Sequence, residues 1–424
     1  MNLRGIIDDN RREVTDVLYL VALQGVNFIA PLVVLPYLMK TLGAAGFGCI
    51  GFSLAVCQYL QLIVDFGFNL SATKRVSLSL PDQGEVNRVF SAVFYAKMAL
   101  LAVSAVLLLA VSLLPAFAVY RPTLYIMFLT VVGNAFLFVF LFQGIGQVRW
   151  VSIANAVAKF AVLPLTFLLV KGPGDCLVAA AVQASVSLVA ALITVSLTAA
   201  RGWARLLRPV WADVRAALRD SWPLFLSSAA TNVYTACFIV ILGLFASPDE
   251  VGRYSAVDRV MRALCYAALL PVLQAFYPKV CRMACSDRAG AWRLGGQLLV
   301  FELLAMTAVG ASLFFGGAWV EAWLKGDYAG TASLFRLDAL VPLFVGAGGV
   351  TGQLMVLALG GERQRVWFKR VYYLAAAVAL AGVLALTPVW GAMGTVAALL
   401  ATECTVAVGF AVCARRMRKE ERRD

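Results

Sequence analysis

The chain has 424 residues, of which 62% are hydrophobic and 14% are charged, and its formal net charge is +13. Its mean hydropathy of +0.85 excludes a soluble globular domain, because the surface of such a domain must be largely polar. The chain has no histidine, which excludes zinc–histidine sites, Ser-His-Asp catalysis and histidine proton relays. Its nine cysteines lack the paired spacing of metal ligands, so we expect no metal, no cofactor and no catalytic residue.

The predicted elements are apolar helices from end to end. Residues 1–16 are polar and carry no cleavable signal pattern, so the first apolar run is expected to be a retained helix. A run of about 20 residues crosses a ~30 Å hydrocarbon core. The sequence therefore predicts an all-α, polytopic membrane protein with about twelve transmembrane helices, at roughly 16–38, 46–70, 89–114, 122–145, 151–171, 176–199, 222–246, 253–280, 294–317, 332–358, 371–387 and 392–413.

The first helix pair contains polar residues that a simple anchor would lack. Gln24 and Asn27 lie inside the first run and Asp65 inside the second, although unpaired polar groups are costly in lipid. Pro31 and Pro36 interrupt the first helix and predict a bend, as in helices that line a cavity.

Basic residues lie mainly on one side of the predicted membrane. With the N-terminus placed in the cytoplasm, 26 of the 36 Lys and Arg residues lie in cytoplasmic segments, five in outer loops and five within spans. This asymmetry predicts that both termini are cytoplasmic.

The predicted spans divide into two sets of six. The segment between them, 201–220, alternates arginines with tryptophans and leucines, so we expect it to lie along the inner leaflet. Asn27 and Gly48 correspond to Asn232 and Gly252 at offsets of 204–205 residues, which favours an internal repeat. We expect lobes at 1–205 and 222–424 around a central cavity, joined by a linker at 206–221.

Ten ionisable residues lie within the predicted spans, where a charge is expensive unless it faces water or another charge. The basic ones are Lys97, Lys159, Arg259, Arg262 and Arg336, and the acidic ones are Asp65, Asp258, Glu302, Asp338 and Glu403. The five acidic residues are candidates for coupling or gating. Glu302 and Glu403 are isolated and could each take up a proton or a cation.

Structural roles are open for most of these charges. Asp258 could pair with Arg262, and Arg336 with Asp338. Asp65 could pair with Lys74 or Arg75 at the end of its helix. The lysines Lys97 and Lys159 could extend toward the inner membrane surface.

Two glycine-containing stretches belong to later spans. Gln143 and Gly144 end the fourth span and place polar groups beside exposed backbone. The run GAGGV at 346–350 has no phosphate-loop lysine and is expected to let its helix bend or pack closely.

Several segments along the chain resemble the polysaccharide-transporter family, the O-antigen flippases of the multidrug/oligosaccharidyl-lipid/polysaccharide exporter superfamily. The similar segments are LQGVNFIAPLVVLPYLMKTLGAAGFG, VDFGFNLSATKRVS, FLFQGIGQVRW, EVGRYSAVDRVMRAL, QAFYPKV and PLFVGAGGVTGQLMVLALGGER.

The resemblance implies a bacterial inner-membrane flippase for undecaprenyl-pyrophosphate-linked oligosaccharide, working by alternating access and coupled to a cation. On this interpretation the five basic residues bind pyrophosphate, and Gln24, Asn27, Gln143 and Asn232 contact glycan or line the cavity. The implied partners are the lipid-linked oligosaccharide, membrane lipids and a polysaccharide polymerase or chain-length regulator, with no nucleic acid. We expect a monomer.

Two other functions are considered. A drug exporter of the same superfamily would favour an acid-dominated cavity for small cations. A polytopic glycan polymerase typically needs a large hydrophilic outer loop, but the longest one here, roughly 318–331, holds only Glu321, Lys325 and Asp327 as charged residues.

Overall fold

A computed structural model describes residues 11–421, except for the side chains of 11–32, 227 and 230–235. The described residues are almost entirely helical and contain no strand, which confirms the predicted all-α class. The helices are α2 (Arg11–Asp65), α3 (Phe68–Ser79), α4 (Gln83–Ser112), η1 (Pro115–Tyr120), α5 (Arg121–Ala135), α6 (Val139–Gly144), α7 (Val148–Leu169), η2 (Pro173–Asp175), α8 (Cys176–Arg201), α9 (Trp211–Phe245), α10 (Pro248–Ser286), α11 (Arg288–Leu324), η3 (Gly326–Tyr328), α12 (Thr331–Asp338), α13 (Val341–Gly349), η4 (Val350–Leu357) and α14 (Glu362–Glu420).

Eight helices in the described part of the chain are long and apolar enough to cross a membrane, or nine with one broken span. The broken span bends by 44° between η3–α12 and α13–η4. The predicted count of twelve is reached when two long helices are divided at internal breaks and α9, which ends in the apolar turns Ala236–Phe245, is included.

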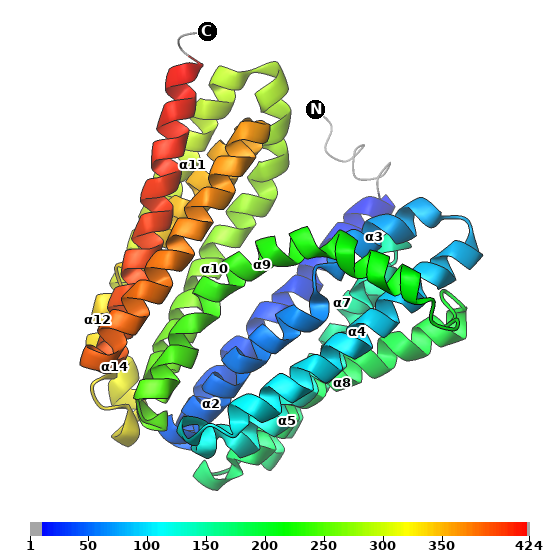
Figure 1. The fold of residues 1–424 in the computed structure, drawn as a ribbon. Helices are drawn as coiled ribbons and strands as arrows, with labels where there is room; N and C mark the ends of the chain where they lie inside the picture. Colours follow the sequence, from blue (N-terminus) through cyan, green and yellow to red (C-terminus); the bar gives the residue numbers. More distant parts are fainter. Residues whose placement is uncertain (1–10, 422–424) are drawn as a thin grey trace. The chain divides into compact units, whose positions relative to one another are not determined.

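Both divisions fall at a glycine. Gly43 interrupts α2 at φ 68°, and Gly391 interrupts α14 at φ 55°. A positive φ is accessible to glycine but costly for other residues. Beyond Gly391 the chain returns along itself, so the halves of α14 lie side by side (Figure 1), with Phe368 stacked on Phe410.

The chain folds into two compact units. The first comprises Met1–Thr41, Leu60–Leu114 and Arg121–Phe225, and the second comprises Leu42–Tyr59, Pro115–Tyr120 and Leu226–Asp424. In the first unit, α8 packs against α5 and α7, and α3 packs against α6. In the second, α11 packs on α10, α12 and α13, while α14 packs on α13 and η4.

Residues 203–210 connect α8 to α9 without forming a helix. Side chains on one face of α4 hold this segment: Gln83 donates to the carbonyl of Trp203, while Asn87 and Ser91 accept from the backbone amides of Arg205 and Leu207. The neighbouring leucines and arginines are exposed, and because 203–210 is not helical they do not form two opposite helix faces. The location along the inner leaflet remains a prediction.

Candidate functional site

The second unit contains a cavity of about 160 Å³ between α10, α13, η4 and α14. Its polar lining comes from Arg262, Tyr266, Gln353, Tyr372 and Glu403, and the rest is apolar. A cavity of this size admits several water-sized groups. A basic and an acidic side chain therefore line the same small polar space within a helical bundle.

The wall of this cavity depends on glycine and on an irregular helix. Gly348 and Gly349 line it, and a Cβ on Gly349 would lie 2.8 Å from the side chain of Leu269. The expectation that this glycine run allows close packing is confirmed. The chain then becomes the π-helix η4, which places Gln353 in the cavity lining. Short π-helical segments occur frequently at functional sites.

Arg262, which lines the cavity, forms an ion pair with Asp258. Its Nε donates to both carboxyl oxygens of Asp258, at 2.9 and 3.0 Å, across one turn of α10. Both side chains are largely buried, with 22% of Arg262 and 9% of Asp258 exposed. The ion pair that the sequence suggested at this spacing is confirmed.

Asp338 and Glu302 are buried without such a partner. Their side chains are 1% and 0% exposed, and neither carboxyl group has a hydrogen-bond partner among the described residues. Leaving such a group unsatisfied costs about 1–3 kcal/mol. Cys265 lies within electrostatic range of Glu302, Asp338 and Glu403, as well as Arg262, so these carboxyl groups gather around one part of the unit.

The suggested pair of Arg336 and Asp338 is wrong. Arg336 is exposed, and its guanidinium lies 6.0 Å from the ring centroid of Phe314, whereas Asp338 is buried. Residues two apart in a helix point to nearly opposite sides, which separates the two charges.

The first unit has a connected polar network. Lys97 is 2% exposed and donates to Asp65 at 3.2 Å, and Gln61 contacts the other oxygen of Asp65 at 3.5 Å. Asn134 donates to Gln61 at 3.0 Å. The lysine also lies 5.9 Å from the ring centroid of Phe140. Four polar side chains from α2, α4 and α5 thus satisfy one another.

The suggested pairing of Asp65 with Lys74 or Arg75 is wrong, and so is the alternative that Lys97 extends toward the membrane surface, because Lys97 is buried against Asp65. The helix α2 ends at Asp65, and Phe66 and Gly67 adopt φ values of 41° and 81° before α3 begins. Arg75 therefore lies on a separate helix and approaches Asp220 at 3.7 Å. A second break, with Phe138 at φ 50°, separates α5 from α6.

The remaining predicted residues occupy varied environments. Arg259 lies over the ring of Phe47 with 5.0 Å between its Cζ and the ring centroid, and Lys159 is half-buried on α7. Gln143 is exposed and accepts a hydrogen bond from Thr73. The side chains of Gln24, Asn27 and Asn232 lie outside the described residues.

Sequence reasoning missed several neutral residues of the cavity and the network. Tyr266 and Tyr372 line the cavity, but isolated aromatic residues in apolar helices give no distinguishing pattern. Gln353 does have one, because it follows the glycine run within an apolar span. Asn134 likewise is an amide inside an apolar span, and each such amide calls for a partner.

The chain matches a known family and full-length relatives. A family model described as "Polysaccharide biosynthesis protein" matches residues 14–284. A protein of Escherichia coli (strain K12) named "Putative O-antigen transporter" is 28% identical over 92% of this chain and 94% of its own. A protein of the same name from Shigella dysenteriae is 27% identical over 92% of this chain and 97% of its own.

Solved transporter structures share the fold. An inward-facing multidrug resistance MATE family transporter of the MOP superfamily aligns with a TM-score of 0.67 and 13% identity, covering 93% of this chain and 99% of its own. The lipid II flippase MurJ in an inward closed conformation aligns with a TM-score of 0.69 and 12% identity, covering 93% of this chain and 87% of its own.

Proposed function

The chain belongs to the polysaccharide biosynthesis protein family and is a multi-pass membrane protein, and from that premise we propose that it is a flippase for lipid-linked oligosaccharide. The cargo is an undecaprenyl-pyrophosphate-linked repeat unit, moved from the cytoplasmic to the periplasmic leaflet of the bacterial inner membrane. The observation that carries this proposal is the match over 92% of the chain to proteins named for O-antigen transport.

The proposed orientation places both termini in the cytoplasm. It rests on the distribution of Lys and Arg, with 26 in the segments assigned to that side and five in the outer loops. We propose that the chain works as two six-span lobes, 1–205 and 222–424, joined by 206–221. Alternating exposure of a site between such lobes requires no covalent chemistry, so no residue has a catalytic role.

Pyrophosphate is the cargo's most strongly charged group and needs basic partners. The five basic candidates are Lys97, Lys159, Arg259, Arg262 and Arg336, of which Lys97 and Arg262 hold carboxyl partners in this structure. Charge-assisted hydrogen bonds from Lys or Arg to phosphate oxygens are short and strong. Lys97 and Arg262 contribute only when the cargo displaces Asp65 or Asp258.

Coupling to a cation is proposed for the carboxyl groups of the second unit. Asp338 and Glu302 have no described partner, and Glu403 lines the cavity beside Arg262. A buried carboxyl group is most stable when it is neutral or paired with a cation. Taking up a proton or a monovalent cation satisfies these groups and shifts the conformational equilibrium by the difference in its affinity for the two states.

Export of surface polysaccharide in a deletion strain tests the flippase proposal. We expect the deletion to accumulate lipid-linked repeat units on the cytoplasmic side, and Lys159→Gln to reproduce this at normal protein abundance. The matched control is Lys171→Gln, which changes an exposed lysine outside the spans and should leave export normal. Normal export with the deletion would contradict the flippase function, and normal export with Lys159→Gln alone would contradict the role of that lysine.

A drug exporter is the second candidate, and one observation favours it. Four acidic residues, Asp258, Glu302, Asp338 and Glu403, lie in the part of the second unit that contains Arg262, an arrangement that suits a small organic cation. Resistance to cationic dyes, measured in the same strains, separates the two functions. Lower dye resistance with unchanged surface glycan would establish the exporter.

A further inference from the structure

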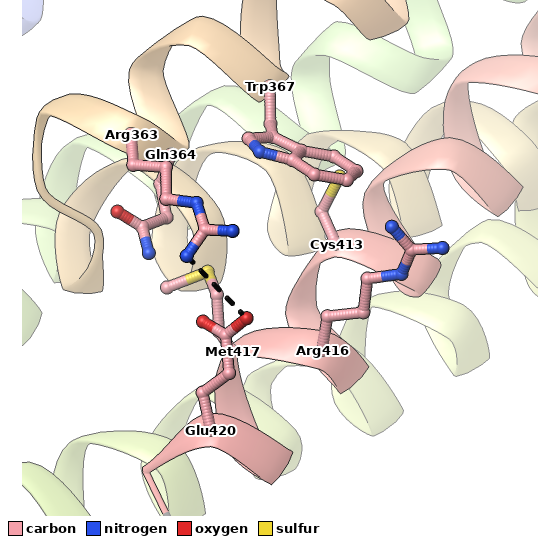
Figure 2. A pocket seen from close by; sticks show the side chains of 7 residues that line it. All are labelled: Arg363, Gln364, Trp367, Cys413, Arg416, Met417 and Glu420. Atoms are coloured by element: carbon pink, nitrogen blue, oxygen red, sulfur yellow. Dashed lines mark ion pairs between the residues drawn. The ribbon is translucent and has the colours of Figure 1, made fainter.

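A second, smaller cavity lies at the end of the second unit where α14 begins and ends. It measures about 30 Å³ and is lined by Arg363, Gln364, Trp367, Cys413, Arg416, Met417 and Glu420 (Figure 2). Residues from the first turns of α14 thus meet residues from its last turns, because the break at Gly391 turns the helix back on itself.

The arginine Arg416 of this cavity lies over an aromatic ring. The guanidinium of Arg416 lies 5.0 Å from the ring centroid of Trp367, and no carboxyl group among the described side chains forms an ion pair with it. Figure 2 shows the indole above Cys413, with the Arg416 side chain to its side. Stacking on an aromatic ring fixes the arginine and leaves its N–H groups available to an anion.

The acidic residue of the cavity, Glu420, forms only a long and exposed ion pair. Arg363 approaches Glu420 at 3.9 Å, with 72% and 54% of their side chains exposed. Exposed pairs at such a distance contribute little, so Arg363 can turn to another anion at low cost. The surrounding positions Arg365, Lys369, Arg370, Arg415, Arg418 and Lys419 are also basic and exposed.

The surface next to this cavity is apolar. Val412 and Val408 precede Arg416 by one and two turns, share its side of the helix and are exposed. Leu374 is exposed two turns beyond Trp367 on the other half of α14. Exposed aliphatic side chains within membrane-spanning helices face acyl chains, so the arginines lie where lipid chains meet lipid headgroups.

We propose that this cavity, defined by Arg363, Trp367 and Arg416, binds the phosphate group of an anionic phospholipid. The space admits about two water-sized groups, which matches phosphate oxygens and excludes a whole headgroup. The two arginines donate to the phosphate, Trp367 supports Arg416, and the acyl chains lie along Val412 and Val408. The bound lipid joins the two ends of α14.

Fluorescence quenching by brominated lipids tests this site. The purified full chain is reconstituted into phosphatidylcholine vesicles in which an equal fraction is brominated phosphatidylglycerol or brominated phosphatidylcholine. Subtracting the signal of Trp367→Phe isolates this one tryptophan. We expect Trp367 to be quenched more strongly by brominated phosphatidylglycerol.

Substitutions that remove a charge should change the preference for phosphatidylglycerol in predictable directions. Arg416→Gln and Arg363→Gln should each lower the preference for phosphatidylglycerol about fivefold, because each removes a guanidinium that donates directly to the phosphate. Glu420→Gln should raise it, because it removes the competing anion. Arg418→Gln is the matched control, an exposed arginine two residues beyond Arg416 that does not line the cavity, and should leave the preference unchanged.

Three results would overturn the proposal. Equal quenching by both lipids would show that the site does not prefer an anionic lipid. An equal loss with Arg418→Gln would show a general surface attraction rather than a site. A change in Trp367 fluorescence on adding inorganic phosphate, together with equal quenching by both lipids, would assign the cavity to a soluble phosphate compound instead of a lipid.

Discussion

Both units contain buried charged groups, but the two units differ in whether these groups have hydrogen-bond partners. In the first, Lys97 and Asp65 pair and are extended by Gln61 and Asn134, so both charged groups of this network have partners. In the second, the Arg262–Asp258 pair lies near Asp338 and Glu302, which have no hydrogen-bond partner in the described part of the chain. A network whose hydrogen bonds are all made favours one arrangement of its side chains. Buried carboxyl groups without partners can instead be stabilised by a ligand that supplies a hydrogen bond or a positive charge.

The largest expected effect comes from breaking the network of the first unit. Asp65→Asn leaves Lys97 as an uncompensated charge at 2% exposure, which should lower the free energy of unfolding by about 3–5 kcal/mol. The measurement is the thermal unfolding midpoint of the purified protein in detergent.

The double variant Asp65→Asn with Lys97→Met supplies the control for this loss. It removes both charges, so it should recover most of the stability. If the double variant is no more stable than Asp65→Asn, the pair does not explain the loss.

A matched comparison in the second unit should separate stability from transport. Asp258→Asn removes the partner of Arg262 and should destabilise the protein, again by about 3–5 kcal/mol. Asp338→Asn removes a charge that has no described partner, so stability should change by no more than about 1 kcal/mol. Export of surface glycan should nevertheless be lost with Asp338→Asn.

Both variants are measured for unfolding midpoint, abundance and export. Equal destabilisation by Asp338→Asn and Asp258→Asn would show that Asp338 has a structural partner. Normal export with Asp338→Asn would remove it from the coupling site. Glu302→Gln extends the comparison to the other buried carboxyl group without a described partner and should behave like Asp338→Asn.

Side-chain support of the segment 203–210 should have a smaller effect. Asn87→Ala removes the acceptor of the Arg205 backbone amide, a bond of 2.7 Å, at a cost of about 1 kcal/mol. Tryptic cleavage at the exposed arginines of this segment should become about fivefold faster, because such a change shifts an opening equilibrium by that factor.

The same substitution at Asn155 is the control. Its side chain donates within its own helix, to the carbonyl of Val151. Equal cleavage rates in Asn87→Ala and the intact chain would show that α4 does not hold the segment.

The sequence predicts the helices well, because a membrane imposes one strong constraint. Each predicted apolar run lies mainly in helix, and the two long helices divide at glycines near the predicted turns. The breaks at Phe66 and Phe138 could not be predicted, because phenylalanine normally avoids positive φ and has no local pattern that marks it.

Pairing of charges was predictable only within one continuous helix. The Asp258–Arg262 pair follows from a spacing of four residues on α10. The Lys97–Asp65 pair joins residues 32 apart on two helices, so it depends on packing that the sequence pattern does not specify. The burial of Asp338 beside an exposed Arg336 follows from helix geometry, which the suggested pairing of neighbours overlooked.

The smallest expected effect concerns a partly exposed ion pair of the first unit, in which 55% of the Arg88 side chain and 16% of the Asp213 side chain are exposed. Arg88 donates to both oxygens of Asp213, at 2.5 and 2.8 Å, in the surface region before the apolar part of α9. These hydrogen bonds hold the pKa of Asp213 below its ordinary value of 3.8. A depressed pKa means that the pair contributes stability above 3.8, and that this contribution is lost as pH falls through the lower folded value.

The unfolding midpoint of the intact chain should therefore fall more steeply below pH 3.8 than that of Asp213→Asn, and the two should differ only slightly at neutral pH. High salt should reduce the difference further, because an exposed pair is screened. The buried pair of Lys97 and Asp65 should resist the same salt. If salt weakens both pairs equally, burial does not protect the Lys97–Asp65 pair from screening, and the proposed difference between the two pairs is wrong.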